Sequence, residues 1–236
     1  MIKLSEILKE GVYDPGIFKA VFTAGGPGSG KSYTASTLFG MPERMPFVSA
    51  KGLKGVNSDS AFETYLDKAG LSQDIKSLNA KDHVKAMELR DQAKRVTVKR
   101  MHNYINGKLG LLIDGTGKNY TKIAKMKVQL QRHGYDCFMV FVNTTLEVAI
   151  ERNEKRPRKV PLDLLKQSWH AVQDNMGRFQ TLFGSNNMLI VDNSTYKEFP
   201  SVVKKAASSF VNRPIRNHVA KQWIKTELEL KKSIWN

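Results

Sequence analysis

Residues 25–32 read GGPGSGKS and directly follow the apolar run FKAVFTA. They match the pattern G-x-x-x-x-G-K-[ST], in which glycines let consecutive backbone N–H groups turn inward around phosphate oxygens. The loop requires a buried strand before it and a helix after it, because the positive end of the helix dipole points at the same oxygens. Both are predicted here, with the helix starting near Lys31. Residues 25–32 are therefore expected to bind the phosphates of a nucleotide triphosphate.

Five apolar runs indicate strands: AVFTA, KGVNS, GLLID, CFMVFV and MLIVD. None alternates strictly between apolar and polar residues, which is typical of buried parallel strands. Segments of helical length lie between them, including residues 32–40, 80–106 and 162–183. This alternation predicts a parallel α/β sheet covered by helices on both faces. We expect a domain over residues 1–196 and a basic helical extension over residues 197–236, interrupted at Asn212-Arg213-Pro214.

The composition, 41% hydrophobic and 25% charged over 236 residues, is that of an ordinary globular protein. No apolar run approaches the roughly 18 residues that span a bilayer, and the first residues do not read as a secretory signal. Apolar positions within residues 2–8 predict a short amphipathic helix instead. The single cysteine, Cys137, fits a reducing cytoplasm and is expected to be a small buried hydrophobe that opens a strand.

The net charge of +16 is concentrated in residues 98–108, in residues 118–132 and in the tail from Lys204 onward. Such an excess attracts polyanions, including nucleic acid. An anionic small substrate is served equally well, and basic helix faces are also commonly just solvated.

The phosphate-binding loop and two further positions are expected to hold ATP: Gly25, Gly26, Pro27, Gly28, Ser29, Gly30, Lys31, Ser32, Tyr33 and Arg158. In GLLIDGTGK, Asp114 ends an apolar strand and should face the loop, where it and the Ser32 hydroxyl are candidate Mg²⁺ ligands. The alternative is that Asp114 caps a strand-to-helix turn. Gly115 stands where ATP-driven motors usually carry an acid that polarises the attacking water. Its absence disfavours a motor that hydrolyses ATP.

Two stretches point to group transfer. In KGVNSDSAF, Asp59 follows a short strand and could accept the proton of an acceptor hydroxyl, although Asn-Ser-Asp-Ser is also a helix-capping sequence. In LEVAIERNEKRPRKVP, a helix would place Arg152 and Arg156 on one face, with Arg158 following in the turn. Planar guanidinium groups stabilise a transferring phosphoryl group. The alternative is a solvated helix end in which these arginines pair with neighbouring glutamates.

The order of AGGPGSGKS, VNSD, LLIDGTGK, LEVAIERNEKRPR and LIVDN resembles the zeta-toxin and polynucleotide-kinase group of P-loop kinases, over residues 19–194. The chain looks similar to phage-encoded members of that group. The resemblance implies a three-layer α/β/α sandwich with a five-stranded parallel sheet. It also implies ATP with Mg²⁺, and transfer of the γ-phosphate to a hydroxyl.

The resemblance also assigns residues. Asp59 matches the catalytic base, Lys31 the phosphate-loop lysine, and Arg152 with Arg156 the arginines of a lid at about residues 151–161. Asp114 and Thr116 match the segment after the third strand. One position departs from the pattern, because Phe62 stands where the family often has an arginine. A helical insert over residues 60–108 is expected to form the acceptor site, and the candidates for substrate contact are Asp59, Arg90, Lys94, Arg95, Thr116 and Lys118.

Two functions remain open. The first is a kinase that phosphorylates a hydroxyl of an anionic acceptor, such as a polynucleotide 5′ end, a nucleotide or a nucleotide-sugar. The second is a nucleic-acid-binding P-loop ATPase whose basic surface binds the polymer. A GTP switch is disfavoured, since Asn143-Thr144-Thr145 follows the fourth strand in place of a guanine signature.

Overall fold

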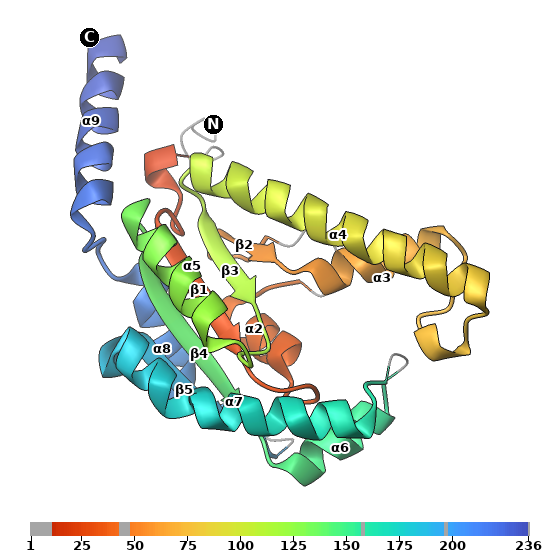
Figure 1. Ribbon diagram of the computed structural model, residues 1–236. Helices are drawn as coiled ribbons and strands as arrows, with labels where there is room; N and C mark the ends of the chain where they lie inside the picture. The colour runs from red at the N-terminus through yellow and green to blue at the C-terminus, as the bar shows by residue number, and fades with distance from the viewer. Residues whose placement is uncertain (1–10, 43–47, 157–158, 196–197, 236) are drawn as a thin grey trace.

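The computed structural model describes residues 11–42, 48–156, 159–195 and 198–235 (Figure 1). The predicted helix of residues 2–8 and Arg158 lie outside these ranges. Within them, no helix is both long enough and apolar enough to cross a membrane.

Five strands form one sheet in the order β2-β3-β1-β4-β5, and every neighbouring pair is parallel. The strands are β1 (Lys19–Ala24), β2 (Leu53–Val56), β3 (Gly110–Asp114), β4 (Asp136–Asn143) and β5 (Met188–Asp192). The five-stranded parallel sheet is confirmed. Strand β2 is shorter than predicted, because residue 57 already caps the helix that follows.

Helices cover both faces of this sheet, as predicted. The described helices are α2 (Lys31–Phe39), α3 (Ser58–Lys68), α4 (Ala80–Asn106), α5 (Tyr120–Arg132), α6 (Leu146–Glu154), α7 (Leu162–Phe183), α8 (Ser201–Asn212) and α9 (His218–Trp235). Short 3-10 turns occur at η1 (Gly11–Tyr13), η2 (Ile75–Ser77) and η3 (Ser185–Asn187).

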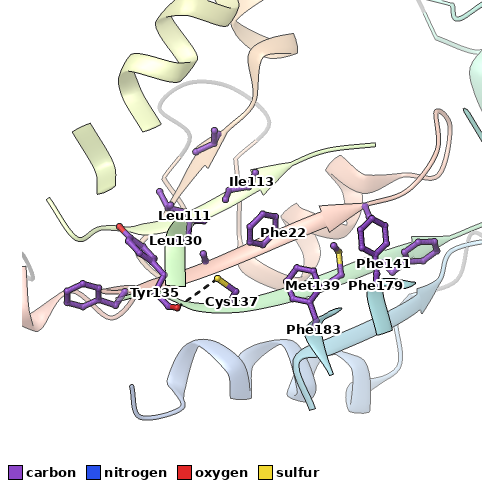
Figure 2. Packing of buried hydrophobic residues seen from close by; sticks show 14 of the residues in the cluster. Phe22, Leu111, Ile113, Leu130, Tyr135, Cys137, Met139, Phe141, Phe179 and Phe183 are labelled. Atoms are coloured by element: carbon purple, nitrogen blue, oxygen red, sulfur yellow. Dashed lines mark hydrogen bonds between the residues drawn. The ribbon is translucent and has the colours of Figure 1, made fainter. Parts of the chain in front are cut away.

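The two faces of the sheet have separate hydrophobic cores. Phe22, Leu111 and Met139 point to the face covered by α4, α5, α7 and α9, where Phe179 and Phe183 of α7 pack on them (Figure 2). Cys137 is buried in this same cluster, as expected. The opposite cluster joins alternate residues of the same strands to α2 and α8. Because both faces are covered, the strands read as continuous apolar runs.

Helix α8 belongs to the second core. The rings of Phe210 and Phe138 stack with centroids 4.4 Å apart, and Phe210, Ala207 and Val211 are buried against the sheet. The expected division of the chain at residue 197 is therefore not visible in the packing. The described part of the predicted extension is split at residues 213–217 into two helices that lie on opposite faces of the sheet.

The segment between α8 and α9 is fixed to the sheet by a charge pair between buried Lys19 and half-buried Asp136. The Lys19 ammonium, in β1, donates to the Asp136 carboxylate at 3.4 Å and to the Arg213 carbonyl at 2.7 Å. The backbone N–H groups of Arg216 and Asn217 donate to the same carboxylate, at 2.8 and 3.1 Å. Burial lowers the pKa of Lys19, which its partner Asp136 partly offsets. These contacts anchor the C-terminal segment to the centre of the fold.

The predicted insert is a pair of helices, α3 and α4, with a core of its own. Phe62, Ala61 and Leu66 of α3 pack against Ala86 and Ala93 of α4. Phe62 is only 1% exposed. The residue that departs from the family pattern is therefore part of the core of the insert.

Candidate active site

A cavity of about 1190 Å³ opens at the carboxyl ends of β1, β2 and β3. The phosphate-binding loop, the segments after β2 and β3, the insert helices and the chain from α6 to α7 all contribute to its walls. This is the position at which open parallel sheets bind their ligands. Most of the candidate residues named from the sequence meet here.

The phosphate-binding loop has the backbone that its glycines predict. Gly28 and Gly30 have φ values of 77° and 83°, in the left-handed region. A Cβ on Gly28 would lie 2.3 Å from the Ala149 carbonyl oxygen, and one on Gly30 would lie 2.2 Å from the Asn193 amide nitrogen. Both positions therefore require glycine.

Two contacts from distant segments hold this loop in place. The Asn193 side chain, 4% exposed, donates its amide N–H to the Ser29 carbonyl at 2.8 Å. The Gly25 N–H donates to the Thr116 carbonyl at 3.0 Å. The loop is therefore fixed by the segments that follow β5 and β3.

Lys31 folds back onto its own loop, where its ammonium donates to the carbonyl oxygens of Gly25 and Gly26. Burial is the largest influence on this group and lowers its pKa. The Asp114 and Asp59 carboxylates raise the pKa, and the Arg156 guanidinium lowers it. The charges expected to handle the phosphates thus lie within electrostatic reach of one another.

Asp114 lies at the end of β3 with both carboxylate oxygens hydrogen-bonded. Oδ1 accepts from the Thr23 hydroxyl at 2.9 Å, and Oδ2 accepts from the Asn57 side-chain amide at 2.8 Å. Asp114 is not the cap of the next helix, because Asn119 caps α5 through the Lys122 N–H. The capping alternative is therefore wrong.

The oxygen groups of this corner suit Mg²⁺, which prefers one or two protein oxygens together with water and substrate phosphates. Asp114 and Ser32 line the same cavity and are such a pair. No group of three or more acidic, histidine or cysteine ligands exists in the part of the chain that the structure describes. The donor set therefore fits a metal held jointly with a nucleotide rather than by a protein cage.

Asp59 lies in the first turn of α3, where its carboxylate is not needed as a cap. Asn57 is the capping residue, and its side-chain oxygen accepts from the Asp59 N–H at 2.7 Å. The two alternatives for this stretch, a helix cap and a group at the site, therefore apply to different residues, Asn57 and Asp59. The stretch does cap a helix, and Asp59 also lines the cavity.

Arg152 and Arg156 both line the cavity, but not from one helix face. Helix α6 ends at Glu154, so the expectation that it carries both arginines is wrong. The chain leaves the helix before Pro157, because the residue preceding a proline disfavours helical backbone. The glutamates have lysine partners: Glu151 pairs with Lys155 and Glu154 with Lys159.

A buried asparagine closes the base of the predicted lid. Asn153, 1% exposed, donates its amide N–H to the Val160 carbonyl at 2.8 Å and accepts from the Val160 N–H at 2.9 Å. This two-bond clasp fixes where the chain leaves α6 and where it returns toward α7. It therefore sets the place from which Arg156 reaches the cavity.

The candidates for substrate contact separate into two groups. Thr116, Lys118 and Arg90 line the cavity, and the Arg90 guanidinium lies 6.0 Å from the centre of the Phe62 ring. Lys94 instead forms an exposed pair with Asp91, and neither it nor Arg95 is among the cavity-lining residues.

Tyr33 also does not line the cavity. Its ring lies 5.5 Å from that of Phe199, outside the walls just described.

Sequence reasoning missed the roles of two asparagines that the quoted stretches VNSD and LIVDN contain. Asn57 bonds to Asp114, and Asn193 bonds to the phosphate-binding loop. The only signal in the sequence was the presence of an asparagine in each stretch. The groups to which these asparagines bond, Asp114 and Ser29, lie far away in the sequence.

Comparison with known proteins places the chain in a family. The sequence profile of the Zeta toxin family matches residues 9–201. No curated protein sequence matches significantly.

Three solved structures are similar in fold. A protein of the PezAT chromosomal toxin–antitoxin system of Streptococcus pneumoniae shares 16% identity over 89% of this chain and 90% of its own, with a TM-score of 0.51. A gluconokinase from Sinorhizobium meliloti shares 14% identity over 84% of this chain and 93% of its own, with a TM-score of 0.45.

The third is a chain of the Pnkp1/Rnl/Hen1 RNA repair complex, with 15% identity and a TM-score of 0.49. The match covers 69% of this chain but only 46% of that one. At such identities these likenesses concern the fold alone, and of the three only the toxin–antitoxin protein has a TM-score above 0.5.

Proposed function

Because the chain belongs to the Zeta toxin family, we propose that it is a P-loop kinase that transfers the γ-phosphate of ATP to a hydroxyl of an anionic acceptor. The observation that carries this proposal is that Lys31, Asp59 and Arg156 meet in one cavity. A nucleotide switch needs no group that accepts a proton from a second substrate, whereas a kinase does.

The proposed step assigns one task to each residue. The acceptor oxygen forms a bond to the γ-phosphorus, the bond from that phosphorus to the β-bridging oxygen breaks, and ADP leaves. Asp59 accepts the proton of the acceptor hydroxyl. Lys31, Arg152 and Arg156 stabilise the charge on the transferring group. Mg²⁺, held by Ser32 and Asp114, would neutralise charge on the β- and γ-phosphates.

The charge of the cavity supports an anionic acceptor. Among the described lining residues, six carry a positive side chain and four a carboxylate. The positive ones are Lys31, Arg90, Lys118, Arg152, Arg156 and Lys159. Arg90 and Lys118 come from the insert and from the segment after β3, so they are the groups we assign to the acceptor.

The test is a transfer assay with γ-labelled ATP and a panel of nucleotides, nucleotide-sugars and 5′-hydroxyl oligonucleotides. We expect label to move to one class of acceptor. Release of the label as inorganic phosphate only, stimulated by nucleic acid, would favour the second candidate below.

The second candidate is a nucleic-acid-binding ATPase, and one observation favours it. Basic stretches that are far apart in the sequence pack against the same core cluster, through Met101 and Tyr104 of α4, Ile123 of α5, and Trp223 and Ile224 of α9. Helix α5 has no acidic residue over its whole length. A polyanion could therefore contact several of these helices at once.

A further inference from the structure

We propose that Asn57 is a positioning residue, which holds the Asp114 carboxylate and the start of α3 in one fixed arrangement. The inference rests on the proposed function, because it concerns the two carboxylates to which that function assigns the metal and the proton. From the sequence, this residue was expected only as part of a helix-capping stretch.

Asn57 contacts both groups through the two ends of one side-chain amide. Its N–H donates to Asp114 Oδ2 at 2.8 Å, and its oxygen accepts from the Asp59 backbone N–H at 2.7 Å. The partners fix the orientation of the amide, since a carboxylate can only accept and a backbone N–H can only donate. One planar group thus connects the end of β3 to the first turn of α3.

The sheet places Asn57 where this contact can form. Val56 pairs with Ile113, so the next residues of the parallel strands β2 and β3, Asn57 and Asp114, follow in register. On the other side, Thr23 of β1 pairs with Asp114 and donates its hydroxyl to Oδ1. The carboxylate is therefore held between its two neighbouring strands.

This arrangement leaves Asp114 free to bind a ligand. Each carboxylate oxygen can accept about two hydrogen bonds and accepts one from the described residues, so lone pairs remain for the cavity that Asp114 lines. Groups that orient a metal-binding carboxylate in this way typically account for about 10–100-fold in metal affinity or activity.

Capping alone does not explain why residue 57 is asparagine. Serine and aspartate cap helices about as well. Aspartate would place a second carboxylate against Asp114, and serine is too short to span the same two partners. Only asparagine, of these three, caps α3 and also donates to Asp114.

The experiment compares Asn57→Ser with Asn79→Ser. Asn79 caps α4 through the Asp82 N–H at 2.9 Å and donates its amide to the Asp82 carboxylate at 2.8 Å, and it is not among the cavity-lining residues. Asn79 therefore makes the same two kinds of contact as Asn57, a helix cap and a bond to a carboxylate, but to a residue outside the candidate site. ATP affinity is measured by calorimetry with Mg²⁺ and with EDTA, alongside thermal unfolding.

We expect both variants to unfold at similar temperatures and to bind ATP equally in EDTA. Only Asn57→Ser should lose about 10-fold or more of the affinity that Mg²⁺ adds. Should Asn57→Ser fold poorly, Thr23→Val removes the other partner of Asp114 without touching the cap, and it should give the same loss.

A full Mg²⁺-dependent gain in Asn57→Ser would reduce Asn57 to a helix cap. A full gain in Thr23→Val would show that hydrogen bonds to Asp114 do not set its contribution to Mg²⁺ binding, and it would overturn the proposal too. Absence of any gain in the wild-type protein would overturn the proposal as well. A wild-type protein that binds ATP with Mg²⁺ but phosphorylates no acceptor would contradict the proposed function alone, because the binding comparison does not require transfer.

Discussion

The Lys31 ammonium lies 2.8 Å from the Gly25 carbonyl oxygen, so the phosphate-binding loop is closed by its own lysine. Bound phosphate oxygens would compete with this carbonyl, and with that of Gly26 at 3.3 Å, for the same three N–H donors. Without the lysine, the loop would lose both an internal contact and the point charge closest to the expected β- and γ-phosphates.

Lys31→Ala is therefore expected to weaken ATP binding and to abolish phosphotransfer. Calorimetry on the folded variant and the γ-label assay measure the two effects separately. Lys51→Ala is a suitable control, since Lys51 bonds to Ser208 on the α8 side. Unchanged turnover in Lys31→Ala would remove the assignment of the loop to the triphosphate.

Asp59→Asn should leave folding and ATP affinity nearly unchanged, because Asn57 rather than Asp59 caps α3. Transfer to the true acceptor should fall by about 10²-fold or more, the usual scale for loss of a general base. Asp67→Asn, on the same helix but hydrogen-bonded to Gln73, should transfer at the wild-type rate. If Asp59→Asn does so too, another group accepts the proton.

Arg156→Lys keeps the charge but loses the planar fork that fits a phosphoryl group. We expect kcat to fall about 10-fold or more while ATP affinity changes less, the pattern of a contact made in the transition state. Arg132→Lys, on the exposed end of α5, is the matched control. A change in melting temperature alone would show that Arg156 is surface structure.

Nucleic-acid contact by the basic stretches on α4, α5 and α9 is best tested by charge reversal rather than by deleting residues 197–236, because α8 is part of the core. If α5 contacts nucleic acid, Lys122→Glu with Lys125→Glu should lower the affinity and flatten its salt dependence. Lys204→Glu with Lys205→Glu makes the same change on α8, on the opposite face. Equal effects of the two pairs would indicate unspecific attraction by the total charge.

Cys137 should be chemically silent in the folded protein. Burial raises the pKa of its thiol to about 12, so almost no thiolate exists near neutral pH. A thiol reagent should therefore react only on unfolding. Since the unfolded thiol ionises at a lower pH than the folded one, this group also favours unfolding as the pH rises from its ordinary pKa toward 12. Rapid labelling of the folded protein would contradict its burial.

The layered fold could be predicted because its signals are local. Helix α4 begins and ends at the predicted residues 80 and 106, and each of the five apolar runs overlaps one strand. The position of α8 was missed because its lysines were given more weight than the spacing of Val203, Ala207, Phe210 and Val211. These residues recur at helical spacing, at intervals of four, three and one, and they face the sheet.

The candidate site was predictable only in part. Lys31 and Asp114 are fixed by motif and strand, and both line the cavity. The end of α6 could have been predicted from Pro157, because the residue before a proline disfavours helical backbone. The four-residue spacing of Arg152 and Arg156 was given more weight. The bonds from Asn57 to Asp114 and from Asn193 to Ser29 could not be predicted, because these partners are 57 and 164 residues away in the chain.

The bond from Asn193 to Ser29 has a consequence for how the protein is made. At roughly 5–20 residues per second, a ribosome needs roughly 8–33 s to add the 164 residues that separate them. Strand β1 also waits for both of its partners, β3 and β4, which are synthesised later. The nascent chain therefore carries its nucleotide loop long before it can hold that loop in shape. The capacity to bind ATP is thus expected to arise only after β5 and Asn193 have emerged from the ribosome.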